Sequence, residues 1–194
     1  TNGGLARVAD DALEHFTEID GLPERRIGAM LVDQAGDLWL GTGGWNLGGN
    51  GVARYLGNEI TTFAEAEGLS SKVVGAIGQG ADGDIWIGTA VGVDRLNGNR
   101  IRAVQDLGRT KGPKSIVRDR RGDLWLGARG VFRCRGHECQ QFLEGDRSFF
   151  ALAVDSTGHL WASRSRPQYE AVSAPPERSL YRFEEDGFAL IAQD

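Results

Sequence analysis

Short runs of alternating apolar and polar residues recur along the whole chain. One kind sets a tryptophan between two aliphatic residues, and it occurs four times, as GDLWLGT (36–42), GDIWIGT (83–89), GDLWLGA (122–128) and GHLWASR (158–164). Turn sequences with Asp and Gly precede each copy. Runs of four to six residues that are rich in β-branched and aromatic side chains and bounded by such turns are typical of strands in hairpins. Only ADDALEHF (9–16) could sustain a turn or two of helix, and it fits the start of an outer strand equally well.

A second strand-like element follows each tryptophan copy. It reads GVARY, GVDRL, GVFRC and SLYRF, and a fifth copy opens the chain as GGLARV (3–8). A further alternating stretch, such as EITTF (59–63), comes after each. The tryptophans are 47, 39 and 36 residues apart, so each repeat of about 40 residues holds four strands. That is the pattern of a β-propeller blade, and the expected fold is all-β, with blades of four antiparallel strands.

The phase of the repeat predicts about four and a half blades, with strands a to d counted from the innermost. Residues 1–24 would supply the outer strands of a first blade, and residues 25–68, 69–108, 109–145 and 146–194 four further blades. Since no a and b strands complete the first blade, we expect the chain to be part of a larger propeller, preceded by residues that resemble WIG. A closed ring would hide every sheet edge.

The residues that recur once per blade are best explained as scaffold. The four tryptophans have aliphatic neighbours and are expected to lie buried between blades. Arginine recurs in the second element, which fits a repeated hydrogen bond or ion pair between blades; these residues are Arg7, Arg54, Arg95, Arg133 and Arg182. The turn aspartates are expected to cap their turns rather than to bind calcium.

Two cysteines, Cys134 and Cys139, flank the predicted c–d turn of the third full blade. They would lie nearly opposite each other across a hairpin, so a cross-strand disulfide, free thiols or a metal site with His137 are all open. Two thiols and one imidazole lack a fourth ligand and a recognised zinc spacing. No cofactor is expected.

Loop lengths distinguish the two faces of the predicted propeller. Because successive strands are antiparallel, b–c and d–a loops share one face, called here the insertion face, and a–b and c–d turns share the other, the turn face. Two b–c connections are one or two residues long, but those at 43–50 and 164–178 have eight and fifteen. Long loops cost little stability and often carry binding residues. The candidates in them are Trp45, Asn46, Arg164, Arg166 and Tyr169.

Basic residues also recur on the insertion face. Fourteen residues before each repeat tryptophan stand Arg25, Lys72, Lys111 and Arg147. At the d–a junctions they would surround the channel mouth and attract an anionic ligand, although ordinary solvated loop charges explain them too. Trp45 is the one tryptophan of five outside the blade register; it could stack on a sugar ring or fold back over its blade as a lid.

Composition and charge limit the classes of binding partner to be expected. The chain has 29 glycines among 194 residues, which implies many tight turns, and a net charge of −5. The acidic balance argues against non-specific nucleic-acid binding. No apolar run approaches the roughly 20 residues of a membrane helix, so no direct membrane insertion is expected. The first residues lack a signal-peptide pattern, so any export signal is expected to have been removed or to lie outside this sequence.

The combined motifs resemble the two-component regulator propeller repeat: an aspartate turn, then G-[ND]-[LI]-W-[LI]-G-T, then G-[LV]-x-R. The match covers nearly the whole chain and is weakest in the last repeat, where WASR replaces WIGT and Ser179 replaces glycine. The resemblance implies the extracytoplasmic, periplasmic sensor of a membrane-bound histidine kinase or hybrid kinase, often one that detects polysaccharide breakdown products. A non-catalytic module that binds a small molecule or oligosaccharide, beside a neighbouring propeller or protomer, is therefore expected.

Two other functions compete with sensing. A protein-interaction or dimerisation platform would use the same insertions. A lyase resembling streptogramin lyases would need a histidine base near the channel, but His15, His137 and His159 are expected at an outer strand, in a c–d turn and after an a–b turn. They are poorly placed to converge with acids on the insertion face.

Overall fold

The protein folds into strands connected by tight turns in a computed structural model. The structure describes residues 3–9, 12–44, 48–57, 59–105, 107, 112–136, 138–144, 149–165 and 178–193. Over these residues it contains eighteen strands and two 3-10 turns, η1 (Glu18–Asp20) and η2 (Glu65–Glu67). The expected all-β architecture is confirmed.

The strands form one hairpin and four sheets of four antiparallel strands. The hairpin pairs β1 (Leu5–Ala9) with β2 (Ala12–Phe16). The first sheet contains β3 (Ile27–Val32), β4 (Leu38–Thr42), β5 (Val52–Leu56) and β6 (Glu59–Phe63). The second contains β7 (Val74–Gln79), β8 (Ile85–Thr89), β9 (Val93–Asn97) and β10 (Arg100–Ala103).

The third and fourth sheets repeat the same order of strands. The third contains β11 (Ser115–Arg118), β12 (Leu124–Gly127), β13 (Gly130–Arg135) and β14 (Glu138–Glu144). The fourth contains β15 (Phe149–Val154), β16 (Leu160–Ser165), β17 (Arg178–Glu184) and β18 (Gly187–Gln193). Each sheet falls within one expected blade, while the limits of the blades stay a prediction.

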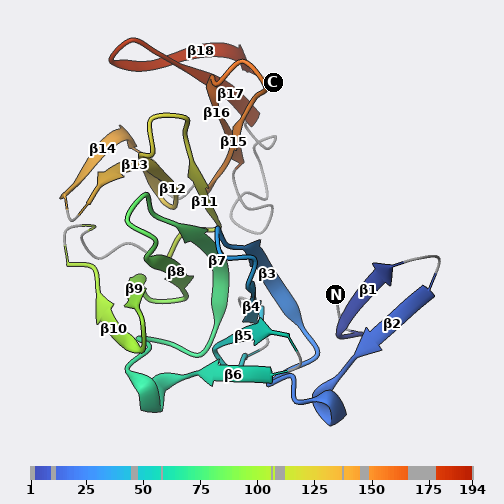
Figure 1. The fold of residues 1–194 in the computed structure, drawn as a ribbon. Coiled ribbons are helices and arrows are strands. Elements are labelled where there is room, and N and C mark those ends of the chain that lie inside the picture. The colour runs from blue at the N-terminus through green and yellow to red at the C-terminus, as the bar shows by residue number, and fades with distance from the viewer. Residues whose placement is uncertain are drawn as a thin grey trace, which may run out of the picture.

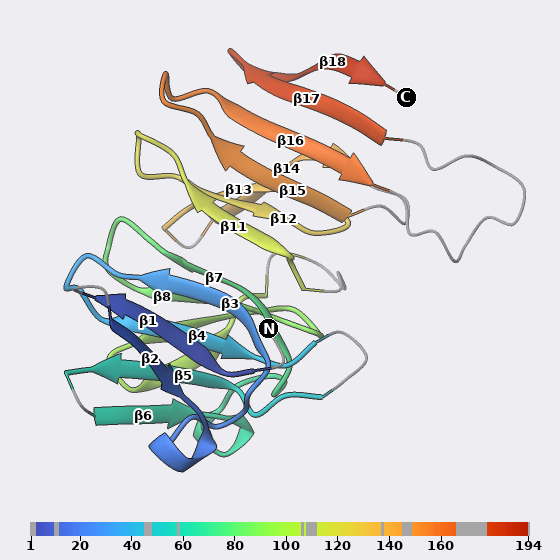
Figure 2. The ribbon, with the colours of Figure 1, turned by 90° about the vertical axis from the view of Figure 1, so that its right-hand side faces the viewer.

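The first strand of each sheet lies on the inner side of the assembly. Strand β7 contacts β3 on one side and β11 on the other, and β11 contacts β15. Figures 1 and 2 show the sheets following one another in an arc, with β6, β10, β14 and β18 at the rim. This arrangement of radial four-stranded sheets is a partial β-propeller.

The core consists of layers between successive sheets. Trp39 packs with Val74, Ile85 and Ile87 between the first two sheets, and Trp86 packs with Leu124 and Leu126 between the next two. Trp125 packs with Leu160 and Ala162 in the last layer, together with Phe183. Trp39, Trp86 and Trp125 are all at most 4% exposed. The scaffold role predicted for these three is confirmed, whereas Trp161, also expected to be buried between blades, is only partly buried.

Close contact between sheets explains the glycine of the W-[LI]-G-T motif. A Cβ atom on Gly41 would lie 2.6 Å from Val74 Cγ1, and one on Gly88 would lie 2.7 Å from Pro113 Cγ. Both contacts are too close for any side chain, because the strand or loop of the next sheet passes directly over these positions. In the fourth sheet Ser163 stands at the equivalent position, two residues after Trp161.

Candidate functional site

The base of the first insertion is tied to the loops around it. The Asn50 amide nitrogen donates to the Thr42 hydroxyl at 2.9 Å, and this buried hydroxyl donates in turn to the Gly51 carbonyl at 2.8 Å. The Asn50 side-chain Nδ2 donates to the Pro23 carbonyl at 2.7 Å. Because Pro23 lies in the loop that leads into β3, Asn50 fastens the b–c loop of the first sheet to the preceding d–a loop.

The insertion narrows to a closed neck. Gly44 and Gly48 form an isolated antiparallel bridge, with the Gly44 amide donating to the Gly48 carbonyl at 3.0 Å. At Gly49, a Cβ atom would lie 2.5 Å from the Lys72 carbonyl oxygen. The backbone of Lys72 therefore borders the neck directly. Trp45 and Asn46, the predicted binding residues of this loop, lie outside the described residues.

Arg25 and Lys72 occupy the same position of the repeat, as expected. The Arg25 carbonyl accepts from the Gly4 amide at 3.0 Å, and the Lys72 carbonyl accepts from the Gly51 amide at 2.8 Å. In both cases the basic residue ties an inner-strand junction to the glycine that opens strand c of the preceding unit. Their backbones are thus scaffold, and their side chains are exposed.

The side chains of these two residues differ in their partners. Arg25 Nε donates to Glu18 Oε2 at 2.5 Å. This hydrogen bond lowers the pKa of the Glu18 carboxyl and raises that of the Arg25 guanidinium. No ion pair of Lys72 occurs among the residues that the structure describes. Both side chains are charged, but within the described residues only the charge of Arg25 is compensated by a carboxylate. Lys72 is therefore the better placed of the two to attract an anionic ligand.

The other predicted binding residues are divided between a strand and the part of the chain that is not described. Arg164 lies in β16, opposite Ser179 of β17, at the place that Thr42 holds in the first sheet. Strands β16 and β17 extend to Ser165 and from Arg178, so the second insertion is shorter than the 164–178 predicted from the sequence. Outside the described residues lie Lys111, Arg147, Arg166 and Tyr169.

Sequence reasoning overlooked one cation on this face. Lys114 precedes β11, and its backbone amide donates to the Gly127 carbonyl at 2.9 Å. Desolvation lowers the pKa of its ammonium group. In the strand register Ser115 corresponds to Ala29, because they pair with the equivalent glycines Gly127 and Gly41. Lys114 therefore stands where the first sheet has Gly28, and no recurring basic position pointed to it.

A second structural unit recurs on the turn face. In the first sheet, Asp33 Oδ1 accepts from the amides of Ala35 and Asp37 at 2.9 Å, while its Oδ2 accepts from the Trp39 indole at 2.8 Å. Asp119 accepts from Trp125 at 2.9 Å in the same way. The predicted capping role of these turn aspartates is confirmed.

The sequence predicted that the repeated arginines bond to neighbouring blades, and the structure shows this for one of them. Arg54 hydrogen-bonds Asp37 within the first sheet, and its guanidinium carbon lies 5.6 Å from the Trp39 ring centroid. Arg95 likewise bonds Asp84 of its own sheet and lies over Trp86. Register pairs each arginine with the tryptophan of the adjacent strand, as Arg54 with Trp39. Arg95 also donates to the Gly136 carbonyl of the third sheet at 3.4 Å, so the predicted bond between blades is present there. The printed bonds of Arg54 within the described residues stay on its own sheet.

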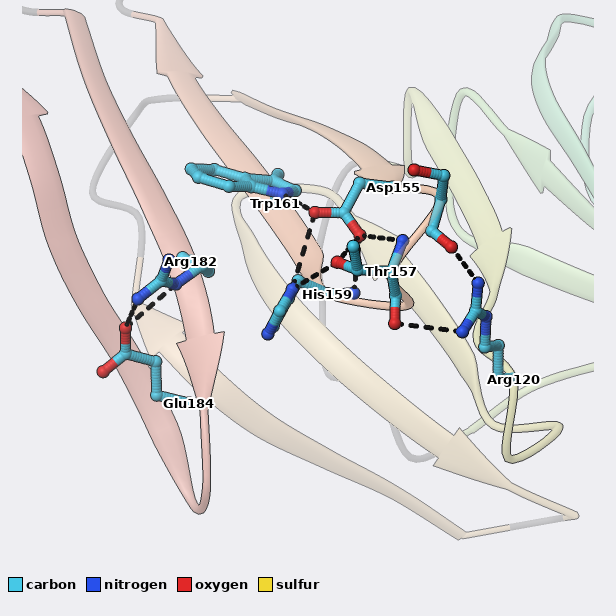
Figure 3. A network of polar contacts seen from close by, with 8 residues as sticks. Arg120, Asp155, Thr157, His159, Trp161, Arg182 and Glu184 are labelled. Atoms are coloured by element: carbon cyan, nitrogen blue, oxygen red, sulfur yellow. Dashed lines mark hydrogen bonds and ion pairs between the residues drawn. The ribbon is translucent and has the colours of Figure 1, made fainter.

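The fourth sheet carries a different polar network on this face (Figure 3). The Thr157 hydroxyl lies 2.6 Å from Asp155 Oδ1 and 2.6 Å from His159 Nδ1. A hydroxyl has one hydrogen, and Thr157 donates it to the Asp155 carboxylate. The Thr157 oxygen therefore accepts a hydrogen bond from the Nδ1–H group of His159. The hydrogen bonds from Thr157 and from the Trp161 indole hold the pKa of Asp155 well below its usual range.

Arg120 links this network to the third sheet. Its guanidinium donates to the Ser156 carbonyl and, at 3.0 Å, to the Thr157 carbonyl, so it spans the a–b turns of two neighbouring sheets. The network is built for positioning rather than for nucleophilic attack, because the Thr157 proton is directed to a carboxylate and away from the imidazole. Sequence reasoning missed it, although histidine in place of the turn's second aspartate was a visible signal.

The described residues offer no metal centre. No group of three or more histidine, cysteine, aspartate or glutamate side chains gathers within them. Cys134 and Cys139 are joined in a disulfide across β13 and β14, so of the three alternatives left open by the sequence, the structure contains the bonded one.

These observations define the class of protein: a set of propeller blades with short turns on one face and insertions on the other. Two segments, residues 21–44 and 68–90, match the two-component regulator propeller family model. The expected resemblance is confirmed, since each segment includes the d–a loop and the first two strands of a blade. A search of curated proteins finds no match to the sequence.

Solved structures share the fold. The extracellular domain of BT4673 from B. thetaiotaomicron, described as a hybrid two-component system, aligns with a TM-score of 0.72 at 20% identity over 98% of this chain and 25% of that chain. The corresponding domain of BT3049 gives 0.59 at 19%, over 77% and 22%. The GH74 enzyme of Niastella koreensis gives 0.64 at 13%, over 88% and 30%.

The chain therefore spans about a quarter of the length of the extracellular domains that it resembles. Identities of this size establish the fold alone. Within the described residues, no helix is long and apolar enough to cross a membrane.

Proposed function

We propose that this module is a non-catalytic, extracytoplasmic ligand-sensing part of a bacterial two-component signalling protein, located in the periplasm, and that it binds an oligosaccharide on the insertion face. The family match and the fold shared with extracellular domains of two-component systems support this role. The observation that carries the binding site is the neck at Gly44 and Gly48, fastened by Asn50 and bordered by Lys72.

The neck is suited to presenting a ligand contact. Its base is fixed by hydrogen bonds to two loops, so the described residues of the insertion need no further ordering when a ligand binds. Trp45 follows Gly44 directly, and an indole ring stacks well on a sugar face. Lys72 adds a positive charge at the same base, which favours an acidic sugar.

A thermal-shift screen with neutral and acidic oligosaccharides, followed by calorimetry on any ligand that stabilises, tests the proposal. We expect Trp45→Ala to weaken binding by about tenfold or more while the melting temperature stays near that of the wild type. Leu56→Ala is the matched control, because Leu56 is 53% exposed at the end of β5, on the turn face. A large loss of stability in Trp45→Ala would identify a lid over the blade and contradict the binding role.

A protein-interaction platform is the second candidate, and one surface favours it. Met30 and Val32 of β3 are 63% and 65% exposed, and Val8 and Leu13 form an exposed cross-strand pair on the hairpin. Exposed apolar side chains on neighbouring elements are typical of contact surfaces. If no oligosaccharide stabilises the module and a partner protein is recovered by pull-down, lost on Met30→Asp, the platform is favoured.

A further inference from the structure

A cleft of about 480 Å³ lies on the face of the second sheet that packs toward the third sheet. Three arginines line it, Arg95 from β9 and Arg100 and Arg102 from β10, and the ring of Trp86 lies beneath Arg95. The cleft lies at the two outer strands of this sheet, β9 and β10, whose place Figure 1 shows. It is separate from the neck of the first insertion, which belongs to the first sheet.

Arg95 is the structural member of the three. Its Nε bonds buried Asp84, and its second terminal nitrogen lies 2.7 Å from Asp82 Oδ2. It also donates to the Gly136 carbonyl of the third sheet at 3.4 Å. Asp84 and Asp82 compensate its charge, so Arg95 repeats the role of Arg54 in the first sheet.

Arg100 and Arg102 have no such compensation. They alternate with Ile101, which packs toward the first sheet, so both point into the cleft. Neither makes an ion pair or hydrogen bond with any residue that the structure describes. Arg102 stands directly opposite Arg95 in the register of β9 and β10. Like charges in directly opposite positions destabilise a sheet.

The internal repeat shows that the scaffold does not require these two arginines. The residues opposite the repeat arginine on the other outer strands are Glu14, Thr61, Gln140 and Ala189. The residues two positions earlier, which correspond to Arg100, are Ala12, Glu59, Glu138 and Gly187. The second sheet alone has arginine at either position.

We propose that Arg100 and Arg102 form a binding site for an oxyanion, a carboxylate or sulfate group that lies in the cleft between them. Two guanidinium groups two residues apart can each donate a pair of hydrogen bonds to such a group. An anion between them would also offset the repulsion between Arg102 and Arg95. This site is independent of the ligand site proposed on the insertion face.

The test follows the Nε–H signals of the arginines by NMR while a sulfated disaccharide, its unsulfated parent or inorganic sulfate is added at constant ionic strength. We expect the sulfated disaccharide to shift the signals of Arg100 and Arg102, with the parent leaving them unchanged. Inorganic sulfate acting as strongly as the sulfated sugar would show that the cleft recognises the oxyanion alone, and a weaker effect would show that it recognises the group on its sugar. No shift of the Arg100 and Arg102 signals with either would overturn the proposal.

The double variant R100E/R102T supplies the decisive comparison, because it installs the residues that the first sheet has at these positions, Glu59 and Thr61. Affinity should fall by about tenfold or more, while the urea midpoint should stay equal or rise, as repulsion is removed. The single variants Arg102→Thr and Arg121→Thr each remove one positive charge and form the matched pair: the first should weaken binding, while the second, on an a–b turn, should bind as the wild type does. Unchanged affinity in the double variant, or equal binding of sulfated and unsulfated sugars, would overturn the proposal.

Discussion

The first and fourth sheets have the same strand order and the same aspartate–tryptophan hydrogen bond. They differ at the positions where the second sheet packs on the first. Asp37 is buried and bonds Arg54, whereas His159 stands in its place with its side chain 53% exposed. Arg182 bonds Glu184, two residues further along its own strand. Gly41 is replaced by Ser163.

This difference separates two kinds of repeat residue. The turn aspartate and the tryptophan are needed to form a blade, because they persist in the fourth sheet as Asp155 and Trp161, joined at 2.8 Å. The second aspartate and the glycine are needed where another sheet packs on the tryptophan face. No further sheet covers that face of the fourth sheet among the described residues.

The largest expected difference in stability between the two sheets concerns their tryptophans. Trp39 is 4% exposed and packs against the second sheet, so Trp39→Ala should lower the free energy of unfolding by about 3–5 kcal/mol. Trp161 makes the same hydrogen bond but is only partly buried, so Trp161→Ala should cost about 1–2 kcal/mol. Urea unfolding followed by circular dichroism measures both, and equal losses would contradict the distinction.

The second largest expected difference in stability concerns the residue after the turn glycine, which is Asp37 in the first sheet and His159 in the fourth. Asp37→Ala leaves the Arg54 guanidinium without its carboxylate, and we expect a loss of about 2 kcal/mol in urea unfolding, moderated because the Arg54 side chain is 36% exposed. His159→Ala, in the equivalent place, removes an exposed side chain and should cost less than about 0.5 kcal/mol. A larger loss for His159→Ala than for Asp37→Ala would show that the fourth sheet depends on its own network.

Much of this architecture could be predicted from the sequence, because a propeller blade is specified locally. Aspartate–glycine turns, period-two strands and a tryptophan every 36 to 47 residues identify the strands without any long-range information. The extent of β16 was not predictable in this way. The motif breaks down at WASR, and only pairing with β15 and β17 extends the strand to Ser165.

Side-chain partners were harder to predict than strands. Arg54 was expected to reach a neighbouring blade, but the strand register keeps it beside Trp39 and Asp37. Contacts that do cross between sheets, such as that from Arg120 to the Ser156 and Thr157 carbonyls, depend on the spacing of two sheets, which no single repeat encodes. The neck of the first insertion likewise could not be predicted, because it depends on the bridge between Gly44 and Gly48.

The smallest expected difference between the two sheets concerns the pKa of the turn aspartates, Asp33 and Asp155. Thr157 in the fourth sheet corresponds to Ala35 in the first, so Thr157→Ala makes the two turns alike. Desolvation opposes the shift of Asp33, but the hydrogen bonds from Trp39 and the backbone lower its pKa as well. We expect Thr157→Ala to raise the pKa of Asp155 toward that of Asp33, as measured by NMR titration of the carboxyl carbons.

The sign of the effect on stability follows from the same shift. Asp155 has a folded-state pKa below its unfolded value of about 3.9, so its stabilising contribution is complete above about pH 4 to 5 and is lost as the pH falls toward the folded-state pKa. The urea midpoint of the wild type should therefore drop between about pH 5 and pH 2, and Thr157→Ala should reduce that drop. Ala35→Thr is the reciprocal control, expected to lower the pKa of Asp33 if the hydroxyl is responsible. An unchanged pKa of Asp155 in Thr157→Ala would instead assign the shift to Trp161 and the backbone amides, which both turns share.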